Sequence, residues 1–453
     1  MKKVLQVLLL GVLATSMSAV QANKMETFSG KTFFAPRTLL NNTAWMNTNM
    51  QKMMMDEDKF GANFQASAFY ASSNVERSRK GLGHYFGTPV VVSDAAQSDS
   101  NINDDAIFRS DKTMSADIAP YRQVWGANLS YNQRLDKVLE GLYFSVQAPI
   151  AQARHTLLKD RKVTANVGAF DYFTGTASDK ANALTSAKFY SGYKEKTALA
   201  DIKAAVGYEV VKSDKVHVGL EATLMIPVGN KVTGEFVFEP VLGFGADHWA
   251  FGAGLHSGFK LYEGHESALD LMVGLDYQYV MSADQVRTAK AKDKSFYGML
   301  AKAADTSATP AANVLTQAVK VEKGSMFDGC ATLCYNHGDF NFDLGYNFFA
   351  REAETVKAKD ASKAIGYSSA EARGTDATYA NHLVADSAVV AADIDYAVAA
   401  APRLISNKVF GSAGYTFDME APVGLSIGGS YEWAYENSGT SGYEFWFKAG
   451  VSF

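Results

Sequence analysis

The sequence Tyr443-Glu-Phe-Trp-Phe-Lys-Ala-Gly-Val-Ser-Phe453 ends the chain, and its side chains alternate in character. Tyr443, Phe445, Phe447 and the other odd-numbered positions are aromatic or aliphatic, whereas the even-numbered positions carry a carboxylate, an indole and an ammonium group. Successive side chains of a strand point to opposite faces, so the pattern predicts a strand with one apolar and one mixed face. This strand stops on the aromatic residue Phe453.

The N-terminus has the features of a secretory signal. Lys2 and Lys3 precede an apolar run at residues 4–14 and a stretch of mainly small residues at 16–22. The apolar run is shorter than the roughly 20 residues that a membrane-spanning helix needs. We therefore expect a signal peptide at residues 1–22, cleaved after Ala22, and export without a helical anchor.

A terminal aromatic that closes an alternating strand, on a chain with an export signal, resembles the last strand of outer-membrane β-barrel proteins of Gram-negative bacteria. The resemblance covers the end of the chain closely and the rest only as a pattern. It implies a porin-like barrel in the outer membrane, with Phe453 as an assembly signal. It also implies contact with outer-membrane lipid, periplasmic chaperones and the barrel-assembly machinery.

Similar alternation recurs along the chain in segments long enough for tilted strands to cross a bilayer. These segments are residues 60–71, 122–132, 141–150, 198–211, 215–226, 249–261, 267–280, 326–335, 340–349, 409–417 and 423–435. With the terminal strand they predict an all-β fold, a transmembrane antiparallel up-and-down β-barrel of about 12 strands. Residues 235–246 alternate in part, and we interpret them as an ordered loop or an extension above the membrane.

Short turns alternate with long polar connections along this chain. The long connections are residues 72–121, 151–197, 227–248, 281–325 and 350–407. Barrels of this class have short periplasmic turns and long external loops, so both termini are expected in the periplasm. The predicted domains are the signal peptide 1–22, a periplasmic extension 23–59 and the barrel 60–453. Two readings of the extension stay open, a partial plug and a short amphipathic helix near the barrel mouth.

The strand faces opposite the apolar ones are predicted to line the lumen, and they carry most of the charge. The predicted pore-lining residues are Arg122, Asp201, Lys203, Glu209, Glu221, Lys260, Asp270, Asp276, Asp328, Asp343, Glu432, Glu444 and Lys448. Acids outnumber bases among them, which favours cations in a hydrated lumen. The alternative is that these charges pair across the interior and hold the wall together.

Composition argues against several other classes of protein. The net charge of −5 disfavours a nucleic-acid partner. Cys330 and Cys334 are four positions apart, about 13 Å on one face of a strand, which is too far for a disulfide. No spacing typical of a zinc site or a phosphate loop is present, so neither a metal nor a cofactor is expected.

The sequence Gly254-Leu-His256-Ser257-Gly258 superficially resembles the catalytic site of outer-membrane phospholipase barrels. Adjacent residues of a strand face opposite sides, so His256 is predicted inside and Ser257 outside, where they cannot share a proton. No Asn is placed to orient the histidine, as a triad requires. We therefore do not expect an enzyme.

Two functions remain at this stage. The first is a porin-like channel for passive diffusion of small hydrophilic solutes, with a weak preference for cations. The second is a non-conducting surface barrel whose long loops bind host or environmental ligands. The solute, the pore radius and whether the chain forms a homo-oligomer stay open.

Overall fold

The structure is a computed structural model of the chain. It describes residues 33–40, 61–77, 90–93, 114–117, 119–159, 163–165, 169–178, 183–292, 299–302, 308–359, 367–372, 383–388, 393–434 and 439–453. The predicted signal peptide, most of the predicted extension and Tyr435 lie outside these residues.

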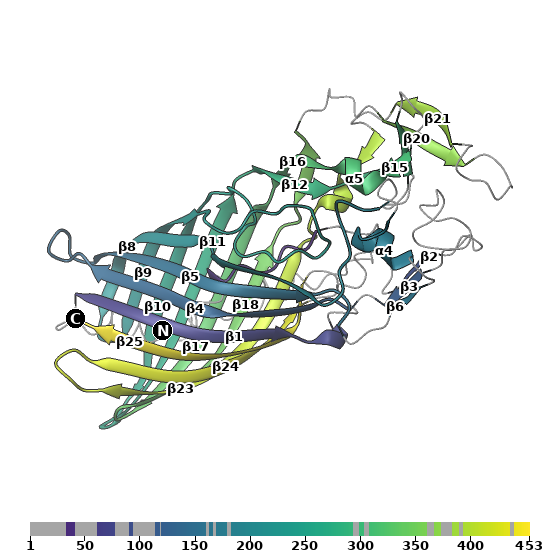
Figure 1. Ribbon diagram of the computed structural model, residues 1–453. Helices are drawn as coiled ribbons and strands as arrows, with labels where there is room; N and C mark the ends of the chain where they lie inside the picture. Colours follow the sequence, from purple (N-terminus) through teal and green to yellow (C-terminus); the bar gives the residue numbers. More distant parts are fainter. Residues whose placement is uncertain are drawn as a thin grey trace.

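A closed antiparallel β-barrel of 12 strands dominates the molecule (Figure 1). Each barrel strand pairs with the next one in the sequence, and the first pairs with the last to close the wall. The predicted up-and-down β-barrel is therefore confirmed. The strands are β1 (Ala62–Ser73), β4 (Tyr121–Arg134), β5 (Leu142–Thr156), β8 (Ile202–Ser213), β9 (Val216–Ile226), β10 (Ala250–Glu263), β11 (Ser267–Val280), β17 (Gly324–His337), β18 (Phe340–Arg351), β23 (Leu404–Phe417), β24 (Val423–Ala434) and β25 (Gly442–Ser452).

One wall position is made of two strands end to end. β7 (Tyr193–Leu199) pairs with the second half of β5, and β8 pairs with its first half. The interruption falls at Ala200 and Asp201, both of which are buried. The sequence predicts one strand here, at residues 198–211, because alternation alone does not reveal the break.

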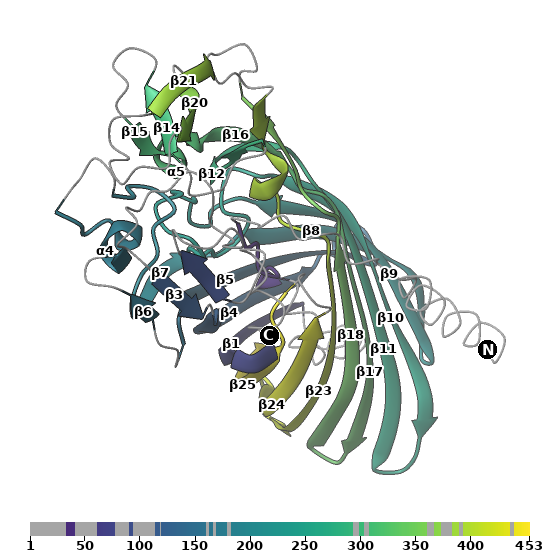
Figure 2. The ribbon, with the colours of Figure 1, turned by 90° about the vertical axis from the view of Figure 1, so that its right-hand side faces the viewer.

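Short turns gather at one end of the barrel and the remaining elements at the other (Figures 1 and 2). At that second end, called the loop end below, four small sheets form, with strand orders β12-β16-β19, β13-β22, β15-β14-β20-β21 and β2-β3-β6. Their strands are β2 (Val90–Ser93), β3 (Met114–Asp117), β6 (Val163–Ala165), β12 (Ala283–Thr288), β13 (Lys290–Ala291), β14 (Met299–Lys302), β15 (Ala308–Pro310), β16 (Thr316–Glu322), β19 (Thr355–Ala358), β20 (Tyr367–Ala372), β21 (Leu383–Ala388) and β22 (Ile394–Asp395). Helical elements among the described residues of this end include α4 (Ala169–Thr174), α5 (Ala311–Leu315) and the 3₁₀ turn η5 (Ala397–Ala399).

The barrel strands follow the predicted segments, but several extend further toward the loop end. β5 continues from the predicted end at residue 150 to Thr156, and β23 begins at Leu404 instead of residue 409. The added residues include Gln152, Arg154 and Ser406, whose polarity masks the continuing strand in the sequence. Residues 235–246 form no strand, only an isolated bridge between Lys188 and Phe236, as expected for an ordered loop.

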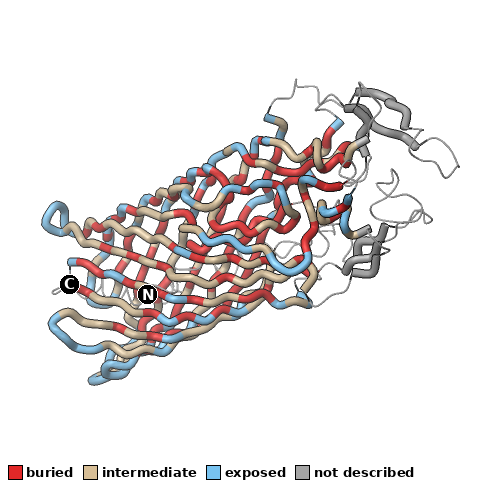
Figure 3. The backbone as a smooth tube through the Cα atoms, viewed as in Figure 1, coloured by how far each residue is buried: buried red, intermediate tan, exposed pale blue. Residues whose placement is uncertain are grey.

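The two faces of the terminal strand β25 differ as the sequence predicts (Figure 3). On its outer face Tyr443, Phe445 and Phe447 are between 43% and 58% exposed. On its inner face Glu444, Trp446 and Lys448 are at most 4% exposed. Exposed apolar side chains therefore cover the outside of the barrel, and polar and aromatic ones fill its interior.

No helix among the described residues is long and apolar enough to span a membrane. Cys330 and Cys334 are both buried, and no disulfide joins them.

Candidate functional site in the barrel lumen

Residues 33–40, called the lumen segment below, pass through the interior of the barrel. All eight are buried. Leu39 packs against Phe69, Val124, Phe410 and Trp446, which are inward residues of β1, β4, β23 and β25. Leu40 contacts a second apolar cluster that includes Met225 and Phe349. Leu39 and Leu40 of the segment thus pack inside the lumen against apolar side chains from several strands.

Arg37 ties the lumen segment to the barrel wall. Its Nη2 donates to Asp328 Oδ2 at 2.7 Å and to the Asn347 amide oxygen, and its Nη1 lies 3.3 Å from Glu432 Oε1. The guanidinium also stacks over the Phe349 ring, 4.7 Å from its centroid. These partners come from β17, β18 and β24, so one side chain bridges three strands.

The lumen segment is held at its backbone as well. Arg351 Nη1 donates to the carbonyl oxygens of Ala35 and Pro36 at 3.3 and 3.4 Å. None of residues 33–40 belongs to a strand. The segment is therefore bound by side-chain contacts and is not a thirteenth member of the wall.

Several predicted pore-lining residues form ion pairs. Lys203 pairs with Asp276 and lies 3.5 Å from Glu221. Lys408 is 3.1 Å from Glu444 Oε2 and 3.6 Å from Glu432 Oε2, so Glu432 connects this lysine with Arg37. Burial strengthens such attractions but requires each charge to find a partner. For these residues, pairing across the interior is the arrangement observed.

The other predicted pore-lining residues have different surroundings. Asp343 accepts from Ser412 Oγ at 2.8 Å, and Glu209 lies 3.5 Å from His217. Asp270 and Lys448 are buried. Lys260 lies near the short-turn end, partly exposed, and bonds to Glu263.

Asp201 has a structural role that the sequence does not reveal. Its carboxylate accepts from the backbone amides of Gly229 and Phe244 at 3.2 and 2.7 Å. These amides belong to the connection between β9 and β10, which is thereby drawn against the break between β7 and β8. Leu242, which belongs to the β9–β10 connection, is part of the same apolar cluster as Leu39.

His256 faces the interior, as predicted, and no hydrogen bond joins it to Ser257. Its ring lies 3.3 Å from the Tyr143 hydroxyl and stacks on His217, with 5.3 Å between ring centroids. The described residues contain no group of three or more acidic, His or Cys side chains arranged to hold a metal.

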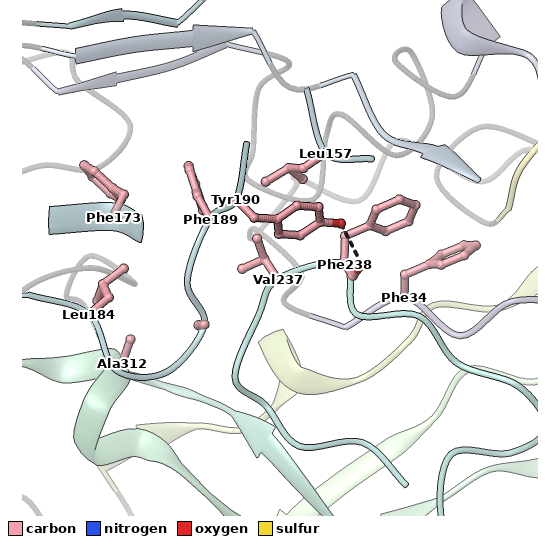
Figure 4. Close-up of a cluster of buried hydrophobic side chains, with 10 residues drawn as sticks. Phe34, Leu157, Phe173, Leu184, Phe189, Tyr190, Val237, Phe238 and Ala312 are labelled. Atoms are coloured by element: carbon pink, nitrogen blue, oxygen red, sulfur yellow. Dashed lines mark hydrogen bonds between the residues drawn. The ribbon is translucent and has the colours of Figure 1, made fainter. Parts of the chain in front are cut away.

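Phe34 of the lumen segment and apolar side chains from several connections form a further core (Figure 4). It contains Phe34 of the lumen segment, Phe238 of the β9–β10 connection, and three residues of the β5–β7 connection, namely Phe173 of α4, Phe189 and Tyr190. The Tyr190 hydroxyl donates to the Phe238 carbonyl oxygen at 3.1 Å. The loops near this end are thus packed against each other and against the lumen segment.

A polar chain beside this core, the rim cluster, consists of His248, Gln285, Arg287, Lys323 and Glu354. Gln285 donates to His248 Nε2 at 2.9 Å and accepts from Arg287 Nε at 2.7 Å. Arg287 Nη1 donates to Glu354 Oε2 at 3.1 Å, and Lys323 pairs with the other carboxylate oxygen. The Arg287 guanidinium also lies over the Phe33 ring of the lumen segment, 3.2 Å from its centroid.

Burial and charge shift the titrations of the rim cluster. Burial opposes ionisation of Glu354, but the adjacent cations Arg287, Lys323 and Arg351 hold its pKa well below the usual value. Burial lowers the pKa of Lys323 to about 8 and that of His248 to about 4. At neutral pH His248 is therefore neutral and accepts from Gln285.

A cavity lies between the lumen segment and the wall formed by β1, β4, β23, β24 and β25. It encloses about 660 Å³ of non-atom space, a figure that includes its opening to the surroundings. Phe34, Pro36, Arg37 and Leu39 form one side, and Arg122, Lys408, Glu432 and Glu444 are among its charged lining residues.

The partial-plug reading of the extension 23–59 agrees with a segment in the lumen, but the sequence does not single out residues 33–40 or predict their apolar contacts. One signal was available, because Phe69, Phe410 and Trp446 occupy inward positions where a hydrated channel has polar side chains. Nothing in residues 33–40 themselves marks them as the partner of these aromatic rings.

No known protein-family model matches the sequence, and no curated protein is significantly similar to it. Among solved structures, an outer membrane channel from Pseudomonas putida F1 has a TM-score of 0.39 at 10% identity, covering 87% of this chain and 96% of that one. The NanC porin has a TM-score of 0.28 at 11% identity, covering 74% and 96%. The P. putida toluene transporter TodX has a TM-score of 0.34 at 10% identity, covering 87% and 90%.

Proposed function

We propose that this chain is an outer-membrane channel for small hydrophilic solutes, and that the lumen segment closes it. The observation that carries this proposal is the course of residues 33–40 inside a closed barrel, with Arg37 bonded to β17, β18 and β24. A barrel built only to display loops does not need a separate segment bound in its interior.

The outer wall supports a membrane location. Leu344, Ile427, Phe445 and Val206 are each more than half exposed on the outside of the barrel. Large exposed apolar areas are rare on soluble monomers, whereas an outward apolar band is the defining feature of barrels in lipid. With the short turns on the periplasmic side, the chain termini lie in the periplasm and the packed loops outside the cell.

The bonding of the lumen segment supports its role as a closure. It contributes no strand, and ion pairs, hydrogen bonds and apolar packing hold it. When Arg37 leaves, Asp328 and Glu432 lose a cationic partner. The open lumen then carries excess negative charge, which would give the channel a weak preference for cations.

The test is conductance of the refolded protein in planar bilayers. We expect the full-length mature protein to conduct rarely, and a variant lacking residues 33–40 to give stable open steps with a cation-leaning reversal potential under a salt gradient. Arg134→Gln is a control for the loss of the Arg37 charge in the deletion. Arg134 is also cationic but bonds to Asp136 at the short-turn end. A folded deletion variant that stays silent contradicts the channel.

A second candidate is a surface barrel whose loops bind a ligand. It is favoured by the core around Phe189, Tyr190 and Phe238, since loops that serve only as connections need no apolar core. Under this alternative, the deletion variant is silent in the same experiment and trimming the connection 352–403 abolishes cell or ligand binding.

A further inference from the structure

Arg122 points a partly unused guanidinium into the loop-end cavity. Its Nε donates to His155 Nε2 at 3.1 Å. Arg122 lines the cavity, and its two terminal nitrogens have no hydrogen-bonded partner among the described residues. Arg37 and Lys408, which line it too, are each paired with carboxylates. Arg122 is therefore the cation of this cavity that is available to a ligand.

His155 fixes the position of this guanidinium. Its Nδ1 lies 3.1 Å from the Phe238 carbonyl oxygen, which can only accept, so Nδ1 carries the proton and Nε2 accepts from Arg122. The imidazole also stacks on the Phe238 ring, with 4.4 Å between centroids. Phe238 itself has a φ of 54°, an unusual conformation for a residue with a side chain, and its carbonyl also accepts from Tyr190. The packed loop thus holds the histidine, and the histidine aims the arginine.

Glu444 presents the complementary charge to the same cavity. Its Oε2 pairs with Lys408, but its Oε1 is buried without a hydrogen-bond donor among the described residues. A buried carboxylate oxygen that lacks a donor is costly, and a ligand that supplies one removes that cost. Ser430, another lining residue, has a buried hydroxyl without a hydrogen-bond partner in the described part of the chain.

Arg122 and Glu444 lie on the two strands that flank β1, as the strand register shows. Glu444 is opposite Ala71 of β1, and Arg122 donates its backbone amide to Ser73 Oγ on the same strand. They therefore project into the cavity from the strands on either side of β1, two residues apart along its length. The wall of the cavity thus carries a cationic and an anionic group.

We propose that this cavity binds a small amino-acid-like zwitterion, with its carboxylate on the free nitrogens of Arg122 and its ammonium group on Glu444. This inference rests on the proposed channel function and assigns the solute class that the channel takes from its loop end. A planar guanidinium suits a carboxylate, because two parallel N–H groups match its two oxygens.

Three probes with similar hydroxylated skeletons separate the charges: L-serine is a zwitterion, L-lactate lacks the ammonium group and ethanolamine lacks the carboxylate. Their binding is measured by calorimetry on the full-length mature protein in detergent. We expect serine to bind more tightly than either of the others. Equal binding of all three, or no binding of serine, overturns the proposal without the need for any variant.

Variants then assign the two ends. Arg122→Gln should weaken serine binding about 10- to 100-fold, as expected for the loss of charge-assisted hydrogen bonds. Glu444→Gln should remove the advantage of serine over lactate, and Arg134→Gln, at the far end of the same strand, should change nothing. Unchanged serine binding by folded Arg122→Gln overturns the assignment of the carboxylate.

Binding in detergent does not require passage, so the two proposals fail separately. Serine binding by a protein that is silent in bilayers, with or without residues 33–40, contradicts the channel and leaves the site intact. An open deletion variant of a protein that never binds serine leaves the channel and removes this site.

Discussion

At the scale of the residue, two buried histidines show how single protons organise the loop end. His155 and His248 each direct Nδ1 at a backbone carbonyl oxygen and use Nε2 as an acceptor, from Arg122 in one case and Gln285 in the other. Protonation of either ring would place two donors face to face. Each histidine therefore supports its neighbour only while it is neutral.

We predict that the rim cluster loosens in mild acid. The pKa of His248 is lowered by burial from 6.5 to about 4, so an opened state binds the proton more readily than the closed one. Stability is thus complete above pH 6.5 and falls as the pH drops toward 4, by up to about 3 kcal/mol. Protonation of Glu354 breaks its ion pairs and lowers the stability further, but only below pH 4.5, the ordinary pKa of this group.

Hydrogen exchange of the β12 amides, corrected for intrinsic rates, measures this opening at pH 7 and at pH 4.5. Faster exchange is expected at the lower pH in the native protein. His248→Gln, which cannot gain a proton in this range, should show much less difference. Equal protection of β12 at both pH values contradicts the prediction.

At the scale of the element, inward glycines make room for rings on neighbouring strands. A Cβ on Gly345 of β18 would lie 2.1 Å from the Phe410 ring of β23, and one on Gly207 of β8 would lie 2.0 Å from the Tyr143 ring of β5. Gly345 and Phe410 are direct partners in the strand register. The sequence shows the glycines on the inner face but not the rings that cover them.

We predict that Gly345→Ala destabilises the barrel by about 1–3 kcal/mol, the usual cost of overpacking a tight contact. The measurement is the urea midpoint of the folded protein in detergent. Gly424→Ala is the control, because a Cβ there has no atom within 4 Å. Gly345→Ala combined with Phe410→Leu should recover part of the loss. A Gly345→Ala midpoint equal to that of Gly424→Ala contradicts this account of the glycine.

At the scale of the whole molecule, the pairing of β1 with β25 turns a sheet into a barrel. The last residue takes part, since the Phe453 amide donates to the Ala62 carbonyl at 2.9 Å and the Ala62 amide donates back at 2.8 Å. The Phe453 ring remains exposed on the outer side. Its backbone and its ring therefore serve separable purposes, closure and contact with the surroundings.

We predict that deletion of Phe453 impairs membrane assembly more than Phe453→Ala, which keeps both backbone hydrogen bonds. Assembly is followed by the fraction of protein that becomes protease-resistant in outer-membrane preparations. If the ring alone is the assembly signal, the two variants will be equally defective. Normal insertion of the deletion variant contradicts any role for the terminal residue.

Sequence reasoning succeeds for this protein where local alternation carries the information. It places every barrel strand and the inner position of residues such as Lys203 and Glu444, because a period of two is visible over about ten residues. It leaves open a plug within residues 23–59 but does not locate the lumen segment, and it does not predict the contact of Asp201 with Gly229 or that of Arg122 with His155. These contacts join residues distant in sequence, and no local period encodes them.

The contacts of Arg37 also bear on the order of folding. This residue reaches Asp328 and Glu432 across sequence separations of 291 and 395 positions. Contacts of such high order carry a large loop-closure cost and form slowly, after the nearest-neighbour hairpins. The lumen segment therefore docks late, against strands from the C-terminal part of the sequence. Its docking slows unfolding of the barrel more than it speeds folding.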